Sequence, residues 1–467
     1  MLKLAAIILA AGQGTRMKSS TPKVLHPLAG RPLIYYSVRA ALDAGASDVV
    51  VVVGRGAKEV ESYLAVTFGK AVRTASQAEQ RGTGHAASMA MPALGDVETV
   101  LVLYGDTPLL EVSDLKALAT ALEGHPDASL ALLTCVLDDP TGYGRVLRDE
   151  KGRVTAIREH RDLLNERERA ITEVNPGVYA ARVPFLRGAL GHLTPNNAQN
   201  ELYLTDVVEA AGKKGGAIAL PTQPASLAGV NDRAQLAAAE AAMFRRIAER
   251  LARSGVTLHG DPRIDETVEV APDVTIHSGV ELRGKTVVKT GTIIDTGSVI
   301  TDAVIETGVT ILPYSVITSS RVGPRARIGP FAHLRPESDI GEEAHVGNFV
   351  ETKKTVMHAR SKANHLAYLG DGEVGEASNV GAGTIFCNYD GFNKHKTTLG
   401  RGVFIGSDSQ LVAPVTVGDG AYVATGATVT KDVPPDALAI GRARQENKLG
   451  YASKLRAKLG DRGKAKK

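Results

Sequence analysis

The chain has 467 residues, of which 43% are hydrophobic and 23% are charged, and its formal net charge at pH 7 is +4. This length predicts two or three domains, and the composition is typical of a soluble globular protein, which excludes a largely disordered chain. The small net charge gives no whole-chain signal for nucleic-acid binding. Cys135 and Cys387 are far apart in sequence and have no CxxC partner, which argues against a disulfide framework or a thiolate zinc site and favours a reducing, cytoplasmic setting.

The opening apolar run, residues 1–11, contains a lysine near its start, as a signal peptide does. It continues directly into Gly-Gln-Gly-Thr-Arg at residues 12–16, however, and this favours a buried first strand. No later apolar stretch reaches the roughly 18 residues expected of a membrane span, so we expect no stable membrane insertion.

Up to about residue 230, short β-branched runs alternate with amphipathic segments. This alternation predicts βαβ units and a Rossmann-like, doubly wound α/β domain. Buried parallel strands are expected at 5–9, 49–53 and 100–104, with a helix at 33–44. The Ala-, Glu- and Arg-rich segment 233–254, closed by Gly255, predicts a helix that links this domain to the next.

Beyond Val256 the period of the sequence changes to six. Three six-residue units per coil, stacked on one another, would form a triangular prism with an aliphatic interior, which predicts an all-β, left-handed parallel β-helix of hexapeptide repeats. The repeated aliphatic positions are Ile293, Val299, Ile305, Ile311 and Ile317, then Val322, Ile328, Leu334, Ile340 and Val346, and finally Ile405, Leu411, Val417, Val423 and Val429.

The six-residue register breaks between Val346 and Val374 and again around residues 388–398. We interpret both breaks as loops, where a regular solenoid can carry a functional site. The predicted organisation is therefore an α/β domain at 1–230, a linker helix at 231–255, a β-helix at 256–442 and a basic tail at 443–467. For the tail, a frayed, solvated segment is favoured over a polyanion-binding one.

A glycine-rich loop follows the first predicted strand. Gly12 and Gly14 let the backbone approach a phosphate, while Arg16 and Lys23 supply the positive charge that a triphosphate requires. The pattern differs from both the dinucleotide GxGxxG and the Walker GxxxxGK[ST] motifs. It therefore predicts a nucleotide site of another kind.

Two further segments suit the same site. Asp106 stands at the end of a predicted parallel strand, where a carboxylate can hold Mg²⁺ against substrate phosphates. The stretch from Gln77 to His85 combines amide side chains with glycines, so Gln77 and nearby backbone groups could bind the edge of a pyrimidine.

A second group of polar residues lies in the first break of the β-helix register. His365 is a suitable base for removing a proton from an amine during acyl transfer. Lys353 and Tyr368 lie close to it in sequence, and Arg335 precedes them. Arg335 and Lys353 together could clamp a phosphate.

These motifs resemble those of a known bacterial family. The glycine-rich loop is followed in order by Gln77 to His85, Tyr104-Gly105-Asp106, the segment from Pro140 to Arg145, Glu159-His160, Asn175 and Gly229-Val230-Asn231. Together with the hexapeptide repeats, they are similar to the bifunctional N-acetylglucosamine-1-phosphate uridylyltransferase/glucosamine-1-phosphate N-acetyltransferase family over nearly the whole chain. The resemblance implies acetyl transfer from acetyl-CoA to glucosamine-1-phosphate, followed by Mg²⁺-dependent uridylyl transfer from UTP with release of pyrophosphate. The product, UDP-N-acetylglucosamine, is a precursor of peptidoglycan and lipopolysaccharide.

The resemblance also implies roles for individual residues of the α/β domain. Arg16 and Lys23 would neutralise the UTP phosphates, Asp106 and Asn231 would ligate Mg²⁺, and the sugar would contact Gly144, Glu159 and Asn175. The full implied set for UTP and UDP-N-acetylglucosamine is Leu9, Ala10, Ala11, Gly12, Gly14, Lys23, Gln77, Gly82, Thr83, Tyr104, Gly105, Asp106, Gly144, Glu159, Asn175 and Asn231. Pro176, beside Asn175, departs from the pattern of the family.

In the β-helix, the segment 381–394 resembles the acetyltransferase loop of the same family. By this resemblance His365 is the general base. Glucosamine-1-phosphate would bind Arg335, Lys353, Tyr368, Asn379 and Lys394. Acetyl-CoA would bind Ala382, Asn388, Tyr389, Ser407, Thr425 and Arg442, where Thr425 replaces a smaller residue. Direct transfer needs no protein nucleophile, so we interpret Cys387, which follows Phe386, as a packed thiol.

The resemblance further implies a homotrimer assembled through the β-helix, with no nucleic-acid partner. Two alternatives remain open at this point. One is an adenylyl- or guanylyltransferase with a regulatory β-helix, and the other is a non-catalytic regulatory subunit of the same fold. The length of the β-helix and the presence of His365 argue against the first, and the retained Arg16, Lys23, Asp106 and His365 argue against the second.

Overall fold

The computed structural model describes residues 3–213 and 215–464. The chain divides into two compact units, Met1–Arg250 with Ile264–Thr267, and Leu251–Arg263 with Val268–Lys467. Within the described residues, no helix combines the length and the apolar character needed to span a membrane.

The first unit is built on a ten-stranded sheet. Its parallel part has the order β5-β4-β1-β6 and consists of β5 (Val72–Ser76), β4 (Asp48–Val53), β1 (Leu4–Ala10) and β6 (Thr99–Tyr104). The strands expected at 5–9, 49–53 and 100–104 are therefore confirmed, with bounds shifted by one residue. All seven residues of β1 are buried, as expected for a strand covered on both faces.

The rest of the sheet is mixed. β11 (Tyr179–Arg182) lies between β6 and β7 (Leu130–Val136) and is antiparallel to both. β12 (Ala217–Pro221) pairs in parallel with β7. An antiparallel extension follows, made of β10 (Glu173–Asn175), β8 (Gly144–Arg148) and β9 (Val154–Arg158).

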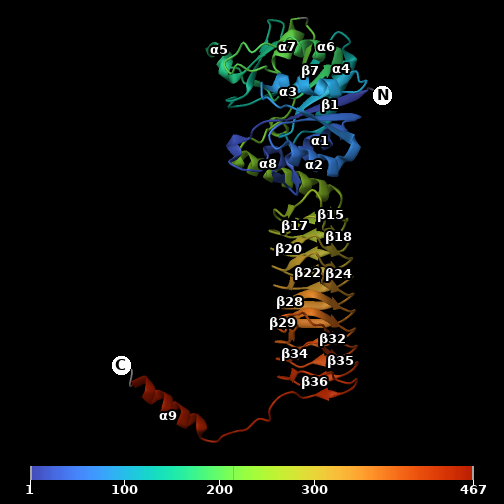
Figure 1. The fold of residues 1–467 in the computed structure, drawn as a ribbon, viewed down its shortest axis with the longest axis vertical. Helices are drawn as coiled ribbons and strands as arrows, with labels where there is room; N and C mark the ends of the chain where they lie inside the picture. The colour runs from blue at the N-terminus through green and yellow to red at the C-terminus, as the bar shows by residue number, and fades with distance from the viewer. Residues whose placement is uncertain (1–2, 214, 465–467) are drawn as a thin grey trace. The chain divides into compact units, whose positions relative to one another are not determined.

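Helices cover both faces of this sheet (Figure 1). One apolar core contains residues of α1 (Leu33–Asp43), α2 (Ala57–Phe68) and α4 (Val112–Gly124). The other contains residues of α3 (Thr83–Ala90), α6 (Val183–Leu190) and α7 (Asp206–Gly212). The remaining helices are the short α5 (Glu166–Arg169) and the long α8 (Arg233–Arg253), which corresponds to the helix expected at 233–254. The Rossmann-like α/β fold is thus confirmed.

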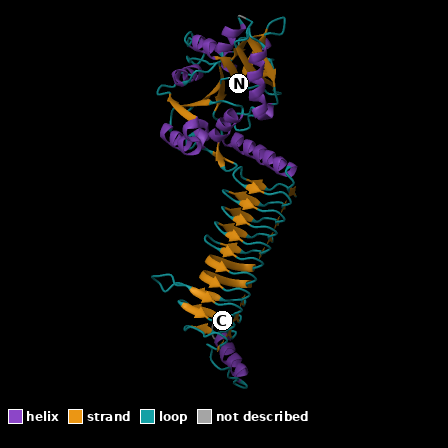
Figure 2. Ribbon diagram, turned by 90° about the vertical axis from the view of Figure 1, so that its right-hand side faces the viewer, coloured by secondary structure: helices purple, strands orange, loops and turns teal. Residues whose placement is uncertain are grey.

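The second unit is a stack of short strands, β13 (Thr257–Leu258) to β38 (Leu438–Ala439), in which a strand generally pairs in parallel with the third strand after it (Figure 2). Three strands therefore complete one coil, as the hexapeptide repeat predicts, and the fold class is that of a left-handed parallel β-helix. Ile305, Ile311 and Ile317 are fully buried in its interior.

The predicted register is wrong by one residue at the start of the repeat. Ile293 is 43% exposed, and the fully buried side chains are those of Ile294 and Ile300. The inward positions then step by five residues from Ile300 to Ile305. A turn that is one residue shorter shifts the register there, so a strict six-residue count selects the neighbouring aliphatic residue.

The first predicted loop is also wrong. Residues 346–374 belong mostly to two long strands, β28 (His345–Met357) and β29 (Lys362–Val374), which pair in parallel along their length. The coil turns without interrupting these strands because Phe349, Lys354, Leu366 and Asp371 adopt positive φ values of 56°, 48°, 42° and 50°. His365 therefore lies on a strand rather than in a loop.

The second predicted loop is present, since residues 388–396 leave the coil between β31 (Ile385–Cys387) and β32 (Thr397–Leu399). The basic tail is exposed over 442–460, as expected, but it is not frayed throughout: Tyr451–Lys464 form helix α9. The last three residues, which also belong to the predicted tail, lie outside the described part of the chain.

Candidate functional site

The site of the first unit forms where β1 and β6 end side by side. The glycine-rich loop follows β1, and Asp106 follows β6. Gly14 begins the short helix η1 (Thr15–Met17) with φ of 62°, and a Cβ atom there would lie only 2.7 Å from Cβ of Lys23. Only glycine therefore allows Lys23 to pack against this loop.

Charged groups converge at these strand ends. The ammonium of Lys23 forms an ion pair with Asp106, and their side chains are only 14% and 15% exposed. Asn231 joins them because the N–H of Val230 donates to the carbonyl of Asp106 at 2.9 Å. Oδ1 of Asn231 accepts hydrogen bonds from Lys23 at 3.1 Å and from Arg16 at 3.0 Å.

The same oxygen atoms suit a magnesium ion. A carboxylate oxygen of Asp106 and the amide oxygen of Asn231 already share one cation, the ammonium of Lys23. No cluster of three or more His, Cys, Asp or Glu side chains that could hold a metal occurs among the described residues. Mg²⁺ commonly uses one or two protein oxygens together with water and substrate phosphates, so the donor set fits this ion.

A cavity of about 310 Å³ opens beside this cluster. Its lining includes most of the residues that the sequence assigned to the nucleotide, namely Leu9, Ala10, Ala11, Gly12, Lys23, Gln77, Gly82, Thr83, Tyr104, Asp106 and Asn231. Arg16 instead lines an adjoining cavity of about 280 Å³ that shares Tyr104, Asp106 and Asn231. Gly14 and Gly105 line neither cavity, and a Cβ on Gly105 would lie 2.7 Å from Ile34.

The cavity also contains residues that the sequence did not single out. Nε2 of Gln80 donates to the carbonyl of Ala11 at 2.5 Å and so connects the stretch from Gln77 to the glycine-rich loop. Glu201 is a second addition. Gln80 could have been found, because it lies within the amide-rich stretch, whereas nothing in the sequence near Glu201 indicated a site.

Gln77 is a buried, hydrogen-bonded residue in the lining of this cavity. It is 4% exposed, and its Nε2 donates to the carbonyl of Gly82 at 3.1 Å. Gly82 has φ of 108°, and a Cβ atom there would lie 2.5 Å from the carbonyl oxygen of Leu202. The segment can therefore approach Leu202 only because residue 82 is a glycine.

The three residues expected to contact the sugar do not line the 310 Å³ cavity. Asn175 uses Nδ2 to donate to the hydroxyl of Tyr179 at 2.6 Å, and its Oδ1 accepts from the N–H of Gly177 at 3.1 Å. Gly144 faces Glu159, since a Cβ atom there would lie 3.5 Å from Oε1. In this conformation both ends of the Asn175 amide are already used within the protein.

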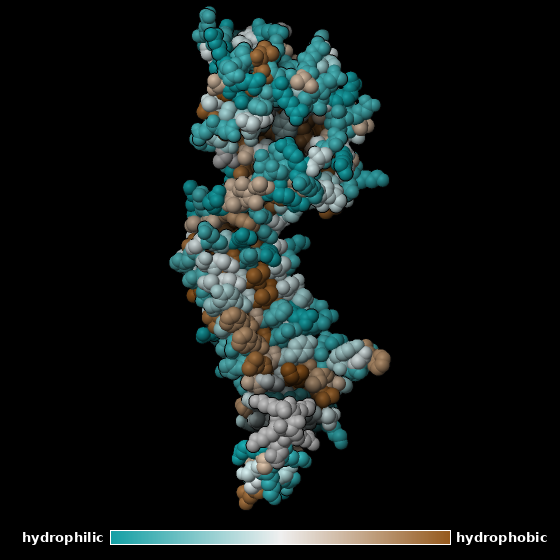
Figure 3. Space-filling model, turned by 90° about the vertical axis from the view of Figure 1, so that its left-hand side faces the viewer, coloured by the Kyte–Doolittle hydropathy of each residue, from teal (hydrophilic) through white to brown (hydrophobic). Residues whose placement is uncertain are grey.

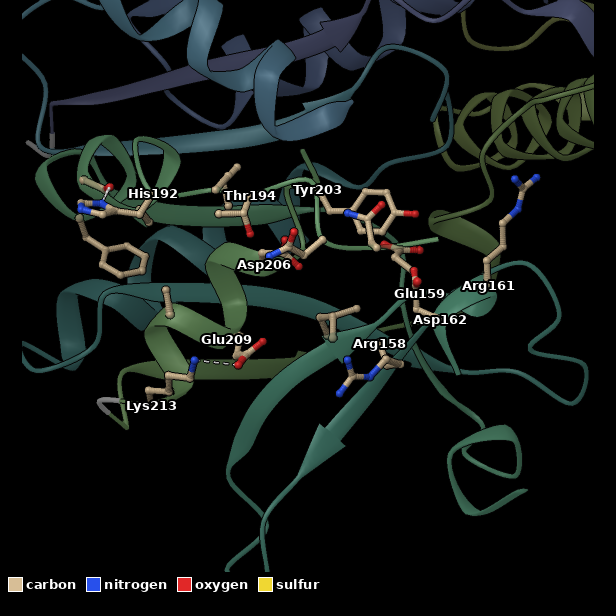
Figure 4. Close-up of a pocket in the computed structure, with 18 of the residues that line it drawn as sticks. Arg158, Glu159, Arg161, Asp162, His192, Thr194, Tyr203, Asp206, Glu209 and Lys213 are labelled. Carbon is tan, nitrogen blue, oxygen red and sulfur yellow. Dashed lines mark hydrogen bonds and ion pairs between the residues drawn. The ribbon is translucent and has the colours of Figure 1, made fainter. Parts of the chain in front are cut away.

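Glu159 lies at a larger cavity of about 1030 Å³, where it is drawn near Asp162 and Tyr203 (Figure 4). Burial raises the pKa of its carboxyl group, although the hydroxyl of Thr205 donates to Oε1 at 3.1 Å. Burial and nearby Glu209 likewise raise the pKa of Asp206 on the same wall. Thr205 is a partner of Glu159 that the sequence did not reveal.

The β-helix brings three of its predicted residues onto one outer face. The N–H of Arg335 donates to the carbonyl of Thr352, so Arg335 lies beside Lys353 on the next coil. Tyr368 lies on the coil that follows the coil of Lys353, and there it pairs with Glu351. NH1 of Arg335 donates to Glu351 at 2.7 Å, and this hydrogen bond raises the pKa of the guanidinium.

His365 lies around the corner from this face. It is an exposed residue of β29, three positions before Tyr368, and its Nδ1 is 2.9 Å from Oδ1 of Asn348. Asn379 lies on the neighbouring face, which the chain follows before it turns at His365. There Asn379 pairs with Lys362 of the preceding coil. The two faces of one chain therefore hold four of the five residues expected to bind glucosamine-1-phosphate.

The fifth residue, Lys394, lies in the loop that leaves the coil. Its ammonium stacks over the ring of Tyr389, 4.4 Å from the centroid. The loop is braced by Asp390, whose carboxylate accepts from the backbone of Asn393 and contacts His395, and these bonds hold the pKa of Asp390 well below its usual range. At the tip, Phe392 is 90% exposed.

Asn388 is the buried base of this loop. It is 4% exposed, and its Nδ2 donates to Oδ2 of Asp371 at 2.5 Å and lies 3.5 Å from the hydroxyl of Tyr368. Gly370 allows this arrangement, because a Cβ atom there would lie 2.6 Å from Nδ2 of Asn388. Asp371 is a further residue of the site that sequence reasoning missed.

The remaining residues expected to bind acetyl-CoA follow one edge of the coils. Backbone hydrogen bonds link successive coils along this edge. The N–H of Asp408, next to Ser407, donates to the carbonyl of Ala382. The N–H of Gly426, next to Thr425, donates to the carbonyl of Ser407. A Cβ atom on Gly426 would lie 3.8 Å from Arg442. Cys387 is only partly buried, so the packed-thiol interpretation holds in part, and burial raises its pKa.

Comparison with known proteins matches the two parts of the chain to two different domain models. The family model for a MobA-like NTP transferase domain matches residues 6–171, and the model for the bacterial transferase hexapeptide (six repeats) matches residues 396–431. The chain is 61% identical over 466 residues to the Bifunctional protein GlmU of Sorangium cellulosum (strain So ce56), covering 99% of this chain and 98% of that relative. It is 51% identical to the Bifunctional protein GlmU of Anaeromyxobacter sp. (strain Fw109-5), with coverages of 99% and 95%. The protein of the same name from Trichlorobacter lovleyi is 48% identical, with coverages of 97% and 98%.

Proposed function

The chain belongs to the family of bifunctional GlmU proteins, and from this premise we propose that it catalyses two consecutive reactions. The β-helix transfers the acetyl group of acetyl-CoA to glucosamine-1-phosphate. The α/β unit then transfers a uridylyl group from UTP to N-acetylglucosamine-1-phosphate and releases pyrophosphate. The full-length match to relatives named as bifunctional disfavours both the regulatory-subunit and the adenylyl- or guanylyltransferase alternatives.

The observation that best supports uridylyl transfer is the convergence of Arg16, Lys23, Asp106 and Asn231 at the strand ends. In-line attack of a sugar phosphate on the α-phosphate needs no protein nucleophile, so positioning and charge neutralisation supply the catalysis. When bound by Asp106 and Asn231, Mg²⁺ neutralises charge on the phosphate oxygens. Lys23 would then be free to turn from Asp106 towards the phosphates.

Acetyl transfer is assigned to His365 as general base. The amine of glucosamine-1-phosphate must lose a proton as it attacks the thioester, and an exposed imidazole can take that proton at neutral pH. Arg335 and Lys353, neighbours on one outer face, would bind the phosphate. The partly exposed Cys387 takes no part, because direct transfer requires no acyl-enzyme.

One assay tests both reactions together. Purified protein is supplied with UTP, Mg²⁺, glucosamine-1-phosphate and acetyl-CoA, and UDP-N-acetylglucosamine is measured. Omitting acetyl-CoA must stop product formation, and supplying N-acetylglucosamine-1-phosphate must restore it without acetyl-CoA. Formation of UDP-glucosamine from glucosamine-1-phosphate and UTP without acetyl-CoA, at a rate comparable to that with N-acetylglucosamine-1-phosphate, would contradict the proposed order.

We further propose that the chain assembles as a homotrimer through an exposed apolar ladder on the β-helix. The ladder consists of Tyr314, Phe331, Phe349 and Leu366, which are 54%, 48%, 55% and 60% exposed. The three aromatic rings stack with centroids 5.4 Å apart in both pairs, on successive coils. Apolar side chains are visible on the surface of the coils in Figure 3. Burying such a ladder against another chain is favourable, and three copies close the contact by cyclic symmetry.

This assembly would share the acetyl-transfer site between chains. The ladder ends at Leu366, directly beside His365, so a neighbour that covers it approaches the base. Sedimentation equilibrium should give about three times the monomer mass at micromolar concentration. Co-refolding an inactive His365→Ala chain with an inactive Lys394→Ala chain should then restore acetyl transfer in mixed trimers. A trimer without recovery would mean that both residues serve one chain.

A further inference from the structure

His365 has a specific partner on the neighbouring coil. Asn348 lies directly opposite His365 in the parallel pairing of β28 and β29, and Oδ1 of Asn348 is 2.9 Å from Nδ1 of His365. An amide oxygen only accepts hydrogen bonds. Nδ1 must therefore carry the hydrogen, and Nε2 of the neutral ring keeps its lone pair.

The surroundings of this pair contain cations and amides. A cavity of about 270 Å³ beside His365 is lined by Asn348, Asn364, His345 and Arg327, and no carboxylate lines it among the described residues. Lys362 adds a further positive charge, because it lies opposite His345 on the next coil. Burial, with the nearby charges of Arg327 and Lys362, lowers the pKa of His345. His345 is therefore neutral at neutral pH and adds no positive charge of its own next to His365.

The identity of the partner decides how His365 works as a base. A carboxylate in place of Asn348 would also fix the tautomer, but it would favour the protonated ring. A neutral amide fixes the tautomer without holding the proton on the ring. An amide partner is thus suited to a histidine that must accept a proton at neutral pH.

We propose that Asn348 is the positioning residue of the acetyl-transfer reaction, which fixes His365 with Nε2 as the proton acceptor. This inference rests on the proposed acetyltransferase function. In the step, the amine nitrogen of glucosamine-1-phosphate forms a bond to the acetyl carbon and gives one proton to Nε2 of His365. The carbon–sulfur bond then breaks, and the proton on Nε2 passes to the sulfur of CoA.

The test compares the acetyl-transfer pH profile of three variants with that of the wild-type full chain. Asn348→Ala removes the acceptor and should lower kcat by about 10- to 100-fold, with KM for both substrates unchanged. Asn348→Asp keeps the acceptor but adds charge, so it should recover most of the rate at high pH and move the acid limb of kcat up by about one pH unit or more. Asn364→Ala, which removes a neighbouring amide of the same cavity, should leave the position of the acid limb unchanged.

The uridylyl-transfer rate of each variant reports on folding of the chain. If the wild-type chain shows no acetyl transfer, the proposed function fails and not the role of Asn348. If the wild-type chain is active and Asn348→Ala stays within about threefold of its kcat, the inference is wrong. Should Asn348→Ala not assemble, Asn348→Asp decides, because an acid limb at the wild-type position would equally overturn the proposal.

Discussion

Asp371 offers a direct way to separate binding of acetyl-CoA from the rest of the acetyl-transfer site. Its carboxylate is the close acceptor for Nδ2 of Asn388, a residue only 4% exposed, and the alternative contact to the hydroxyl of Tyr368 is 3.5 Å long. Asp371 has φ of 50°, so glycine is the substitution that removes the carboxylate without straining the backbone. Asp371→Gly therefore leaves the amide of Asn388 buried without a good partner.

The expected size of the effect follows from this hydrogen bond. A bond to a charged group contributes about 1.5–3 kcal/mol, and the lower value applies because Asp371 is itself half-buried. If Asn388 contacts acetyl-CoA, losing the about 1.5 kcal/mol of free energy that holds Asn388 in its binding position should raise KM for acetyl-CoA about tenfold. The KM for glucosamine-1-phosphate should change much less.

The assay follows thiol release from acetyl-CoA at varied concentrations of each substrate. Asp371→Asn is the matched control, since its amide oxygen still accepts from Asn388 and asparagine tolerates a positive φ. Its KM for acetyl-CoA should stay within about threefold of wild type. A folded Asp371→Gly chain with an unchanged KM for acetyl-CoA would refute the reasoning.

Two other substitutions test the two-site account, and a third tests the packing of the β-helix. Asp106→Ala should abolish uridylyl transfer by removing a metal ligand, while thiol release from acetyl-CoA continues at nearly the normal rate; loss of both activities in a folded chain would rule out separate sites. His365→Ala should lower acetyl transfer by roughly 10²- to 10⁴-fold and leave uridylylation of supplied N-acetylglucosamine-1-phosphate intact, and a rate within a few-fold of wild type would remove this residue from the mechanism. Phe386→Ala empties a fully buried position in the β-helix and should lower the free energy of unfolding of that unit by about 3–5 kcal/mol, measured by urea denaturation; a change below about 1 kcal/mol would show that the coil refills the space.

The sequence predicted the parallel centre of the α/β sheet because its strands are continuous apolar runs. β1 and β4 contain hardly any polar residues, and no other element type explains such runs next to an amphipathic helix. The antiparallel insertion of β11 was not predictable in the same way. Its four residues carry no signal of direction, which is set by the connections on either side and by packing against β6 and β7.

The lining of the 310 Å³ cavity, which we propose binds the nucleotide, was largely predictable for a related reason. Its residues follow strands whose ends must meet at one edge of the sheet, so the local motifs already define the geometry. The arrangement of the residues expected to contact the sugar depends instead on side-chain rotamers. Asn175 binds Tyr179 and Gly177 in the structure, and Glu159 depends on Thr205, which lies 46 positions away in sequence. Such pairings are decided by tertiary packing rather than by motif.

The β-helix shows which distant pairs a repeat can reveal. A period of six identifies the inward positions, but the outward partners of a residue lie one whole coil away. Asn348 and His365 are 17 positions apart, as are Asp371 and Asn388. Three six-residue repeats give 18 positions per coil, so counting one coil along the sequence misses both partners by one residue, because each of these coils is one residue shorter. The count fails where a loop leaves the coil, since Ser378 and Val403 are neighbours at a separation of 25. The six-residue period therefore leads to within one position of the partner of His365, whereas pairings between residues on either side of the loop 388–396 required the structure.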